Sequence, residues 1–385
     1  MNKQLGKIKH NLINRADYYL YRLSNCFRLP QQNTLKNAYK DKFRIGAGIN
    51  TSVSGGYNRK AIHILRQFFN AITPMDCMKM IYIQPKQGIY HFRETDEFVR
   101  FGKWYEMDLV GHSLIWGLKN PDWIFTDNNG LDISQQELVN RMQTYIHTVI
   151  NRYKNDIHIW DVVNEALRDD GQYVNNRYFQ ILGEEYIDLA FRFAREADPD
   201  AILYYNDLKL SKETKREGTI KLIKRLQKNG IQIDGIGIQA HCNMSFPDIQ
   251  ELEKTIIAFS ELGCKISITE LDVSVLPVVN PFVDPEIALS PAYKQSLNPF
   301  AQNVPDEIAE LQYKRYKDLF NLFIKYQDNI DRITLWGITD DMSGKNNFPT
   351  PGRTDYPLLF DRNYQAKPVV KDLIDMGKIN PAKPL

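Results

Sequence analysis

The sequence predicts an α/β fold in which eight parallel strands close into a barrel surrounded by helices. From residue 43 onward, short β-rich runs alternate with longer amphipathic segments. Strict alternation of this kind is typical of a parallel sheet covered by helices, and eight such units are the number that closes a (β/α)₈ TIM barrel. The length of 385 residues is enough for one such domain with extended loops.

The predicted strands are short apolar runs, and the predicted helices are longer segments whose apolar residues recur every three or four positions. The strands are expected at Phe43–Gly48, Met78–Ile83, Asp108–Leu114, Ile157–Val162, Ala201–Tyr205, Ile233–Gln239, Lys265–Thr269 and Arg332–Gly337. The clearest helical segments are Gln135–Tyr153, Tyr178–Ala197, Lys212–Asn229, Phe246–Leu262 and Glu307–Tyr326.

The barrel is expected to occupy residues 35–375, between an N-terminal extension (1–34) and a short C-terminal tail (376–385). The extension is basic, has a helical pattern around residues 16–23, and lacks the continuous apolar core of a signal peptide. Inside the barrel domain, the connection 274–305 is long and rich in Pro and Asn. Loops of this length in compact domains are usually functional or poorly ordered.

Composition excludes several classes of partner. The net charge is only +2, and charges of both signs are interspersed, which gives no support for nucleic acid or an anionic membrane as partner. No run approaches the roughly 18 apolar residues of a membrane span. Four scattered cysteines are expected to be buried free thiols, and no metal spacing or phosphate-binding loop is present. We expect no metal or cofactor, and we expect the chain to be a monomer.

Polar and aromatic side chains gather where the predicted strands end. In a barrel, the carboxyl ends of the strands form one rim, and active sites are assembled there. A single glutamate at a strand end means little, but convergence of this many residues on one rim indicates a site. The residues are His112, Trp116, Asn164, Glu165, Asn206, Asp207, Gln239, His241, Glu270, Asp272 and Trp336.

Two of these residues fit paired-carboxylate catalysis on a glycoside. The reaction needs one carboxyl group that protonates the leaving oxygen and a second, ionised one that attacks the sugar. We expect Glu165 and Glu270 to fill these roles at a separation of about 5–5.5 Å, which gives retention of configuration. His241 is expected to hydrogen-bond Glu270 and to be oriented by Asp272, while Asn164 is placed to bind the sugar 2-hydroxyl.

Several segments resemble the signatures of glycoside hydrolase family 10, the endo-β-1,4-xylanases. The resemblance covers residues 35–370, and the long loop after the seventh strand resembles that of Bacteroidetes members. The segments are Trp160–Ala166, Ile268–Asp272, Gly111–Trp116, Gln239–His241, Trp336–Asp340, Pro357–Asp361 and Lys367-Pro368.

The resemblance implies an endo-acting, retaining hydrolase of xylan-type polysaccharide, with Glu165 as acid/base and Glu270 as nucleophile. Lys79, His112, Asn164, Gln239, His241 and Trp336 are implied to line the sugar subsites; Asp76, Trp116, Asn206 and Lys119 are further candidates for substrate binding. A polymeric plant substrate would favour a secreted, periplasmic or cell-surface location, although this chain shows no signal peptide and a cytoplasmic one stays open.

The chain departs from the family pattern on the side that binds the non-reducing part of the substrate. Met75 and Asp76 stand where the family usually has Glu and Asn. Gly117 and Lys119 replace the usual His and Gln, Leu208 replaces a Tyr, and Gly344 replaces a Trp. We expect Gly117 and Gly344 to open space for a substituent on the sugar, and Lys119 to lie near an anionic substituent or simply in solvent.

Three alternatives to a decorated-xylan hydrolase stay open. The same mechanism can act on another decorated β-glycan, or the departures can reflect drift towards weak activity. A non-catalytic glycan-binding protein on this scaffold is disfavoured because both glutamates and their His and Asn supports are present.

Overall fold

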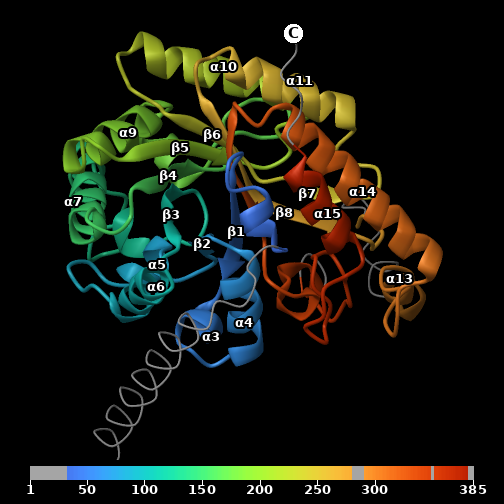
Figure 1. Ribbon diagram of the computed structural model, residues 1–385. Helices are drawn as coiled ribbons and strands as arrows, with labels where there is room; N and C mark the ends of the chain where they lie inside the picture. Colours follow the sequence, from blue (N-terminus) through green and yellow to red (C-terminus); the bar gives the residue numbers. More distant parts are fainter. Residues whose placement is uncertain (1–32, 280–289, 348–350, 380–385) are drawn as a thin grey trace, which may run out of the picture.

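A computed structural model describes residues 33–279, 290–347 and 351–379. Its centre is a closed barrel of parallel strands, with helices packed around the outside (Figure 1). Of the nine strands among these described residues, all but the short β7 (His241–Asn243) form the barrel, which closes where β1 pairs with β9 and β6 pairs with β8. The predicted TIM-barrel architecture is confirmed.

The barrel strands are buried along nearly their whole length, and most of their residues are apolar or small, as expected for strands covered on both faces. In order they are β1 (Arg44–Ile49), β2 (Ala71–Pro74), β3 (Asp108–Trp116), β4 (Ile159–Asn164), β5 (Ile202–Asp207), β6 (Gly235–Ile238), β8 (Lys265–Ser274) and β9 (Ile330–Leu335).

The prediction of the second strand is wrong. The run Met78–Ile83 is not a strand: its last four residues form the short helix α5 (Met80–Ile83). The strand lies earlier, at Ala71–Pro74, where Ala71 pairs with Gly46 of β1 and with Asp108 of β3. A short apolar run fits a strand or a buried helical turn equally well, so periodicity alone does not separate the two.

The helices cover the barrel in sequence order, and most of the predicted ones are confirmed to within a few residues. One is divided: the segment predicted as Tyr178–Ala197 forms α8 and α9, which meet at Gly183 with φ +61°. The helices outside the barrel are α2 (Leu35–Ala38), α3 (Thr51–Ser54), α4 (Arg59–Phe68), α6 (Arg93–Trp104), α7 (Gln135–Tyr153), α8 (Arg177–Leu182), α9 (Glu185–Ala197), α10 (Glu213–Lys228), α11 (Ile249–Ser260), α13 (Pro291–Ser296), α14 (Asp306–Lys325) and α15 (Val369–Lys378).

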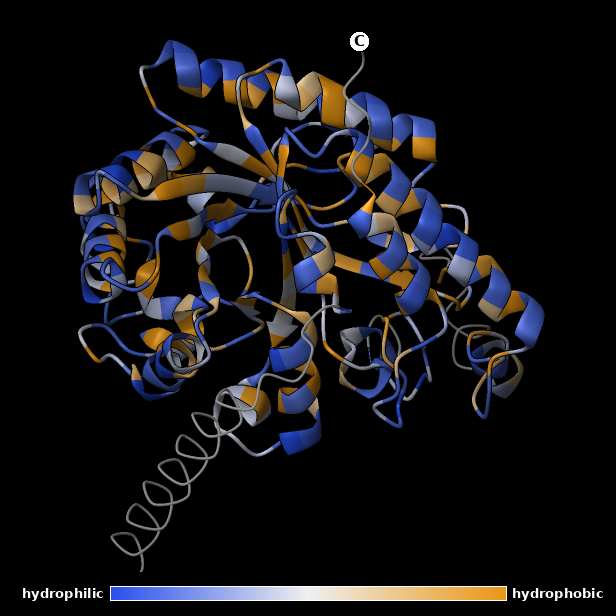
Figure 2. Ribbon diagram, viewed as in Figure 1, coloured by the Kyte–Doolittle hydropathy of each residue, from blue (hydrophilic) through white to orange (hydrophobic). Residues whose placement is uncertain are grey.

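Side-chain caps mark where α7 and α11 begin. Ser134 caps α7 by accepting from Glu137 N, and Asp248 caps α11 by accepting from Gln250 N and Glu251 N. Each helix then has one apolar and one polar face, visible as orange and blue stripes in Figure 2. The apolar stripe packs onto the barrel.

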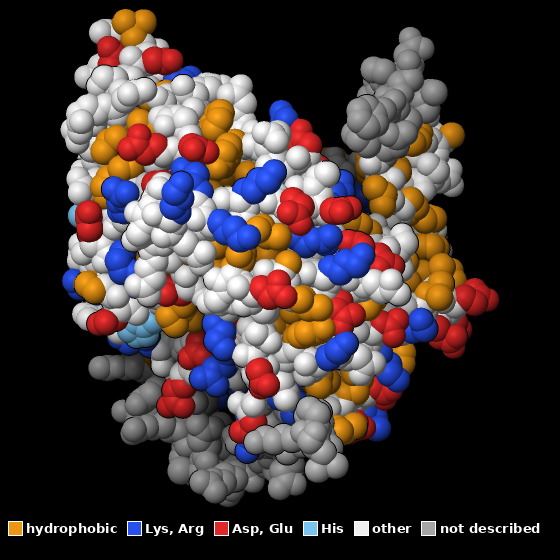
Figure 3. Space-filling view, turned by 90° about the horizontal axis from the view of Figure 1, so that it is seen from above, with side chains coloured by type: hydrophobic (Ala, Val, Ile, Leu, Met, Phe, Trp, Pro, Cys, Tyr) orange, Lys and Arg blue, Asp and Glu red, His pale blue; other side chains and the backbone are white. Residues whose placement is uncertain are grey.

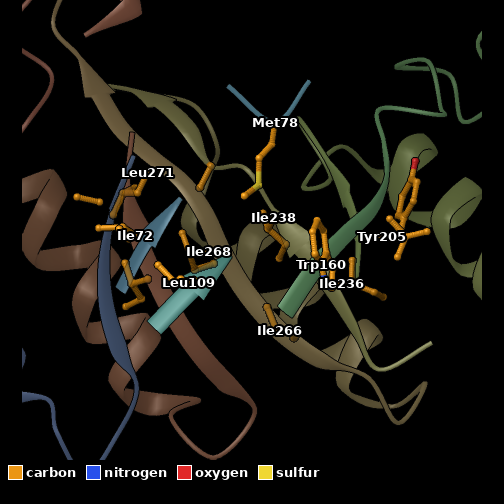
Figure 4. Close-up of a cluster of buried hydrophobic side chains, with 14 of the residues drawn as sticks. Ile72, Met78, Leu109, Trp160, Tyr205, Ile236, Ile238, Ile266, Ile268 and Leu271 are labelled. Atoms are coloured by element: carbon orange, nitrogen blue, oxygen red, sulfur yellow. The ribbon is translucent and has the colours of Figure 1, made fainter. Parts of the chain in front are cut away.

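The core lies between the strands and this helical layer. Figure 4 shows part of it, with Ile72 of β2, Leu109 of β3 and Trp160 of β4 among its buried side chains. Gly102 of α6 lets the helix approach closely, because a Cβ there would lie 2.1 Å from Leu109 Cδ2. This packing fixes the strand ends that carry the site.

The charged side chains on one face, the helices and the described cysteines can each be compared with the expectations from composition. Positive and negative side chains are intermixed on the face seen in Figure 3. Within the described ranges, no helix has the length and apolar character needed to cross a membrane. Cys77, Cys242 and Cys264 are buried free thiols, whereas Cys26 and the predicted N-terminal helix lie outside the described residues.

Candidate active site

The predicted site residues converge at the carboxyl ends of the barrel strands. Glu165 directly follows β4, and its backbone N–H donates to the carbonyl of Asn206 at the end of β5 (2.9 Å). Glu270 lies within β8, and its N–H donates to the carbonyl of Gln239, just beyond β6 (2.9 Å). These main-chain bonds fix the two glutamates on one rim.

A continuous chain of side-chain amides joins the two carboxylates. Gln239 Nε2 donates to Glu165 Oε1 at 2.9 Å and to Asn164 Oδ1 at 3.4 Å. Asn206 Nδ2 donates to the same Asn164 oxygen at 2.9 Å and to Glu270 Oε1 at 3.1 Å. Three amide side chains therefore span the distance between Glu165 and Glu270, which places both carboxylates in one polar cluster.

Glu165 receives a second hydrogen bond from an aromatic neighbour. Trp116 Nε1, at the end of β3, donates to Glu165 Oε2 at 3.0 Å. The ammonium of Lys79 lies 5.2 Å from the centre of the Trp116 ring and 3.3 Å from Asp76 Oδ1. The predicted group of Asp76, Lys79 and Trp116 is thus contiguous with Glu165.

The backbone at Glu165 adopts a left-handed conformation, with φ +56°. Side chains of successive strand residues normally point to opposite faces. Here Asn164 and Glu165 both hydrogen-bond to Gln239, so the chain must turn between them. Left-handed geometry at a non-glycine residue costs roughly 1–3 kcal/mol and is concentrated at functional sites.

Glu270 is held by an array of charged side chains. His241 Nε2 lies 3.2 Å from Glu270 Oε2, and His241 Nδ1 lies 2.8 Å from Asp272 Oδ2, as predicted. Burial opposes a charged imidazole, but the carboxylate of Asp272 and the bond to Glu270 outweigh it and raise the pKa of His241 to about 9. Burial also disfavours a charged Glu270; the donated bond and positive charge of His241 outweigh that effect and lower the pKa of Glu270.

His112 and Trp336 pack against each other, and His112 lies close enough to Glu270 to act on its charge. His112 Nδ1 lies 2.8 Å from Asp161 Oδ2, and its ring packs edge-on against Trp336 with centroids 5.6 Å apart. Gly48 of β1 accommodates the indole, since a Cβ there would lie 2.9 Å from Trp336 Cε3 and 3.3 Å from Met75 Cγ. Met75 and the Trp336 indole therefore lie against the same position of β1.

Comparison with known proteins identifies this arrangement. The family description "Glycosyl hydrolase family 10" matches residues 34–376, nearly the whole chain. The chain belongs to glycoside hydrolase family 10.

Its family 10 relatives are named as xylanases. Endo-1,4-beta-xylanase A of Xylanibacter ruminicola is 38% identical over 345 residues, covering 90% of this chain and 94% of that protein. Endo-1,4-beta-xylanase A of Caldicellulosiruptor saccharolyticus is also 38% identical, covering 89% and 96%. A solved GH10 endoxylanase from a sugarcane soil metagenome matches with a TM-score of 0.84 at 40% identity, covering 90% of this chain and all of that one. The protein is therefore a glycoside hydrolase of a family that acts with retention of configuration.

Gly344 and Gly117, two of the departures from the family pattern, have different surroundings. A Cβ added at Gly344 would meet no atom within 4 Å, so this position faces open space. The expectation that Gly117 also opens space is wrong. A Cβ there would lie 2.8 Å from Asn176 Nδ2, because the Asn176 side chain packs directly against the glycine.

Lys119 is the site candidate that the structure does not bring to the cluster. Its side chain is exposed and makes no hydrogen bond or ion pair with the other candidates among the described residues. Its role as a substrate contact stays a prediction.

Two residues that were not predicted from the sequence hydrogen-bond to side chains of the site. Asp161 pairs with His112, and Thr269 Oγ1 donates to Asn206 Oδ1 at 2.6 Å. A carboxylate inside the apolar strand Ile159–Asn164 was the available signal for Asp161. No comparable signal marked Thr269. Within the described ranges, no group of three or more His, Cys, Asp or Glu is arranged to hold a metal ion.

Proposed function

We propose that this protein is an endo-acting β-1,4-xylanase that cleaves decorated xylan by double displacement, with Glu165 as acid/base and Glu270 as nucleophile. The observation that carries this proposal is the amide chain that links Glu165 to Glu270 across the rim. It brings together two carboxylates whose hydrogen-bond partners differ in charge.

Glu270 suits the role of nucleophile because its surroundings keep it ionised. It accepts from Asn206 and lies 3.2 Å from the His241 imidazole, and its pKa is lowered although the side chain is buried. An ionised carboxylate is needed to attack the anomeric carbon and form the glycosyl–enzyme ester.

Glu165 suits the role of acid/base because its partners are neutral donors. Trp116 and Gln239 each donate one N–H to a different oxygen of the carboxyl group, which fixes its orientation. The group can then give its proton to the leaving oxygen and later take one from water. If the reaction retains the anomeric configuration, the carboxyl groups of Glu165 and Glu270 are expected to lie about 5–5.5 Å apart.

Asn164 is proposed to bind the sugar 2-hydroxyl. Its Oδ1 accepts from both Asn206 and Gln239, which orients the amide, and its Nδ2 makes no hydrogen bond among the described residues. A donor held in this way strengthens its contact as charge develops in the transition state.

Xylan is proposed as the polymer because the relatives are named endo-1,4-beta-xylanases. The open space at Gly344 supports a substituent on the sugar bound there. Digestion of linear xylan beside heavily branched glucuronoarabinoxylan tests this point. Comparable or faster cleavage of the branched polymer is expected, and much faster cleavage of the linear one would overturn it.

The catalytic assignment is tested with Glu270→Ala and Glu165→Ala, using Glu310→Ala on the exposed face of α14 as the control. Loss of the nucleophile should lower kcat by several orders of magnitude, with xylo-oligosaccharide binding retained. Proton NMR of the first-formed product should show the β-anomer. Initial release of the α-anomer, or undiminished activity of Glu270→Ala, would refute the roles.

Turnover by the unmodified chain separates a hydrolase from a glycan-binding protein. A binding protein would show measurable affinity for xylo-oligosaccharides and no turnover even in the unmodified chain.

A further inference from the structure

A lysine that the sequence reasoning did not single out lies beside the array that supports Glu270. Lys345 belongs to the 3₁₀ turn η3 (Gly344–Asn346), directly after the glycine that faces open space. Its ammonium is 3.9 Å from Asp272 Oδ1. The Asp272 side chain is fully buried, whereas that of Lys345 is 28% exposed.

The two oxygens of Asp272 have different surroundings. Oδ2 is paired with His241 Nδ1, but Oδ1 is buried and has no hydrogen-bond partner among the described residues. An ionised oxygen buried without a partner is costly unless a charge compensates it. Within the described ranges, Lys345 is the only cation that forms an ion pair with this oxygen.

Building on the proposed role of Glu270 as nucleophile, we propose that Lys345 is a positioning residue of the reaction: its ammonium balances Asp272, which holds His241 against Glu270. The row Glu270, His241, Asp272 and Lys345 alternates in charge, from anion to cation to anion to cation. Lys345 does not need to touch the sugar to act in this way.

The row matters most in the second step of the reaction. When Glu270 is esterified its charge is lost, and two cations face the single anion Asp272. In deglycosylation, water oxygen bonds to the anomeric carbon, its proton passes to Glu165, and the electron pair of the ester bond returns to Glu270. A surplus of positive charge behind Glu270 favours that return.

Lys345 also opposes the protonation of His241. The charged groups that face His241 are Glu270 and Asp272 from β8 and Lys345 from η3. Further out, His112 of β3 faces Glu270, and the buried Asp355 faces Asp272. Of the groups that face His241 directly, Lys345 alone lowers the pKa of His241, so its removal should raise that pKa.

The test compares Lys345→Met with Lys345→Arg, and with Lys371→Met, which removes a lysine from an exposed ion pair on α15. The pKa of His241 is followed by NMR of ¹³C-labelled imidazoles, with His241→Gln assigning the resonance. Lys345→Met should raise it by about half a unit or more, whereas Lys345→Arg and Lys371→Met leave it unchanged.

Turnover of 2,4-dinitrophenyl β-xylobioside gives the second readout, because its leaving group needs no proton. Slower deglycosylation in Lys345→Met should lower kcat and KM together, by about three- to tenfold, and leave kcat/KM nearly unchanged. Lys345→Arg should restore both values.

An unchanged His241 pKa in folded Lys345→Met, or a loss of kcat/KM without that shift, would overturn the positioning role. If Lys345→Met does not fold, Lys345→Gln gives the same reading, since it also removes the charge. Undiminished activity of Glu270→Ala would instead refute the nucleophile itself, so the two failures are distinguishable.

Discussion

Trp116 Nε1 donates a hydrogen bond of 3.0 Å to Glu165 Oε2, and the same indole ring faces the ammonium of Lys79 at 5.2 Å. One aromatic side chain thus orients the proposed acid/base and positions a cation beside it. Because the indole has a single donor, the hydrogen bond can be removed while an aromatic ring is kept.

Trp116→Phe should therefore lower kcat/KM by about 10- to 100-fold, since a hydrogen bond to a charged group contributes roughly 1.5–3 kcal/mol. Steady-state kinetics on an aryl β-xylobioside measures the change. Trp123→Phe is the matched control, because Trp123 Nε1 donates to the backbone carbonyl of Gln84 instead (2.8 Å). Equal losses in both variants would contradict an effect through Glu165.

Protonation of His241 should make stability depend on pH. Its pKa rises from 6.5 in the unfolded chain to about 9 in the folded protein, so its contribution is fully present below pH 6.5 and is lost as the pH rises through 9. We expect the free energy of unfolding of the wild type to exceed that of His241→Gln by about 2–3 kcal/mol near pH 6. Above about pH 10 the two free energies should differ little. Thermal unfolding across this range measures the difference, with the exposed His63→Gln as control. A difference independent of pH would argue against a charged imidazole.

Gly344→Trp should change substrate preference rather than stability. The position faces open space and its φ is not left-handed, so an indole can be accommodated without displacing a neighbour. Stacking on a sugar should raise kcat/KM several-fold on linear xylo-oligosaccharides, and the filled space should lower it on branched ones. Gly344→Ala is expected to leave both values unchanged. Unaltered preference in Gly344→Trp would place the substituent elsewhere.

Gly117→Ala should destabilise the protein by about 1–3 kcal/mol, because the new Cβ overlaps the Asn176 side chain. Denaturant unfolding measures this loss, with Gly344→Ala expected within about 0.5 kcal/mol of wild type. Adding Asn176→Ser removes the amide nitrogen at 2.8 Å but keeps an oxygen to cap α8. The double variant should recover part of the stability lost in Gly117→Ala. If the effects of the two substitutions on the free energy of unfolding simply add, the overlap is not the cause of the loss.

The sequence predicts the structure well in two cases: where an apolar helical repeat extends over many residues, and where a polar side chain follows a strand. The helix Gln135–Tyr153 was predicted at its observed bounds, and the contacts of His241 with Glu270 and Asp272 followed from strand order. The second strand was missed because Ala71–Pro74 is only four residues long, and the neighbouring apolar run Met78–Ile83 competed with it.

Contacts between distant loops were outside the reach of the sequence. Gly117 was expected to be an opening because it stands where the family usually has His, yet the side chain of Asn176, from the loop after β4, fills the space. Lys345 and Asp272 are likewise far apart in sequence, and only the closed barrel brings them to 3.9 Å. Tertiary packing, rather than local propensity, decides such pairs.

The left-handed backbone at Glu165 is unfavourable for stability, but it holds the side chain proposed as acid/base in place. Glycine adopts this conformation with the least steric cost, so Glu165→Gly should relax the chain as it abolishes the proposed proton transfer. An inactive protein that melts above its active parent is the expected result. If Glu165→Gly behaves in this way, the residue proposed to transfer the proton also limits thermal stability, and stabilising substitutions belong on the outer helices rather than at position 165.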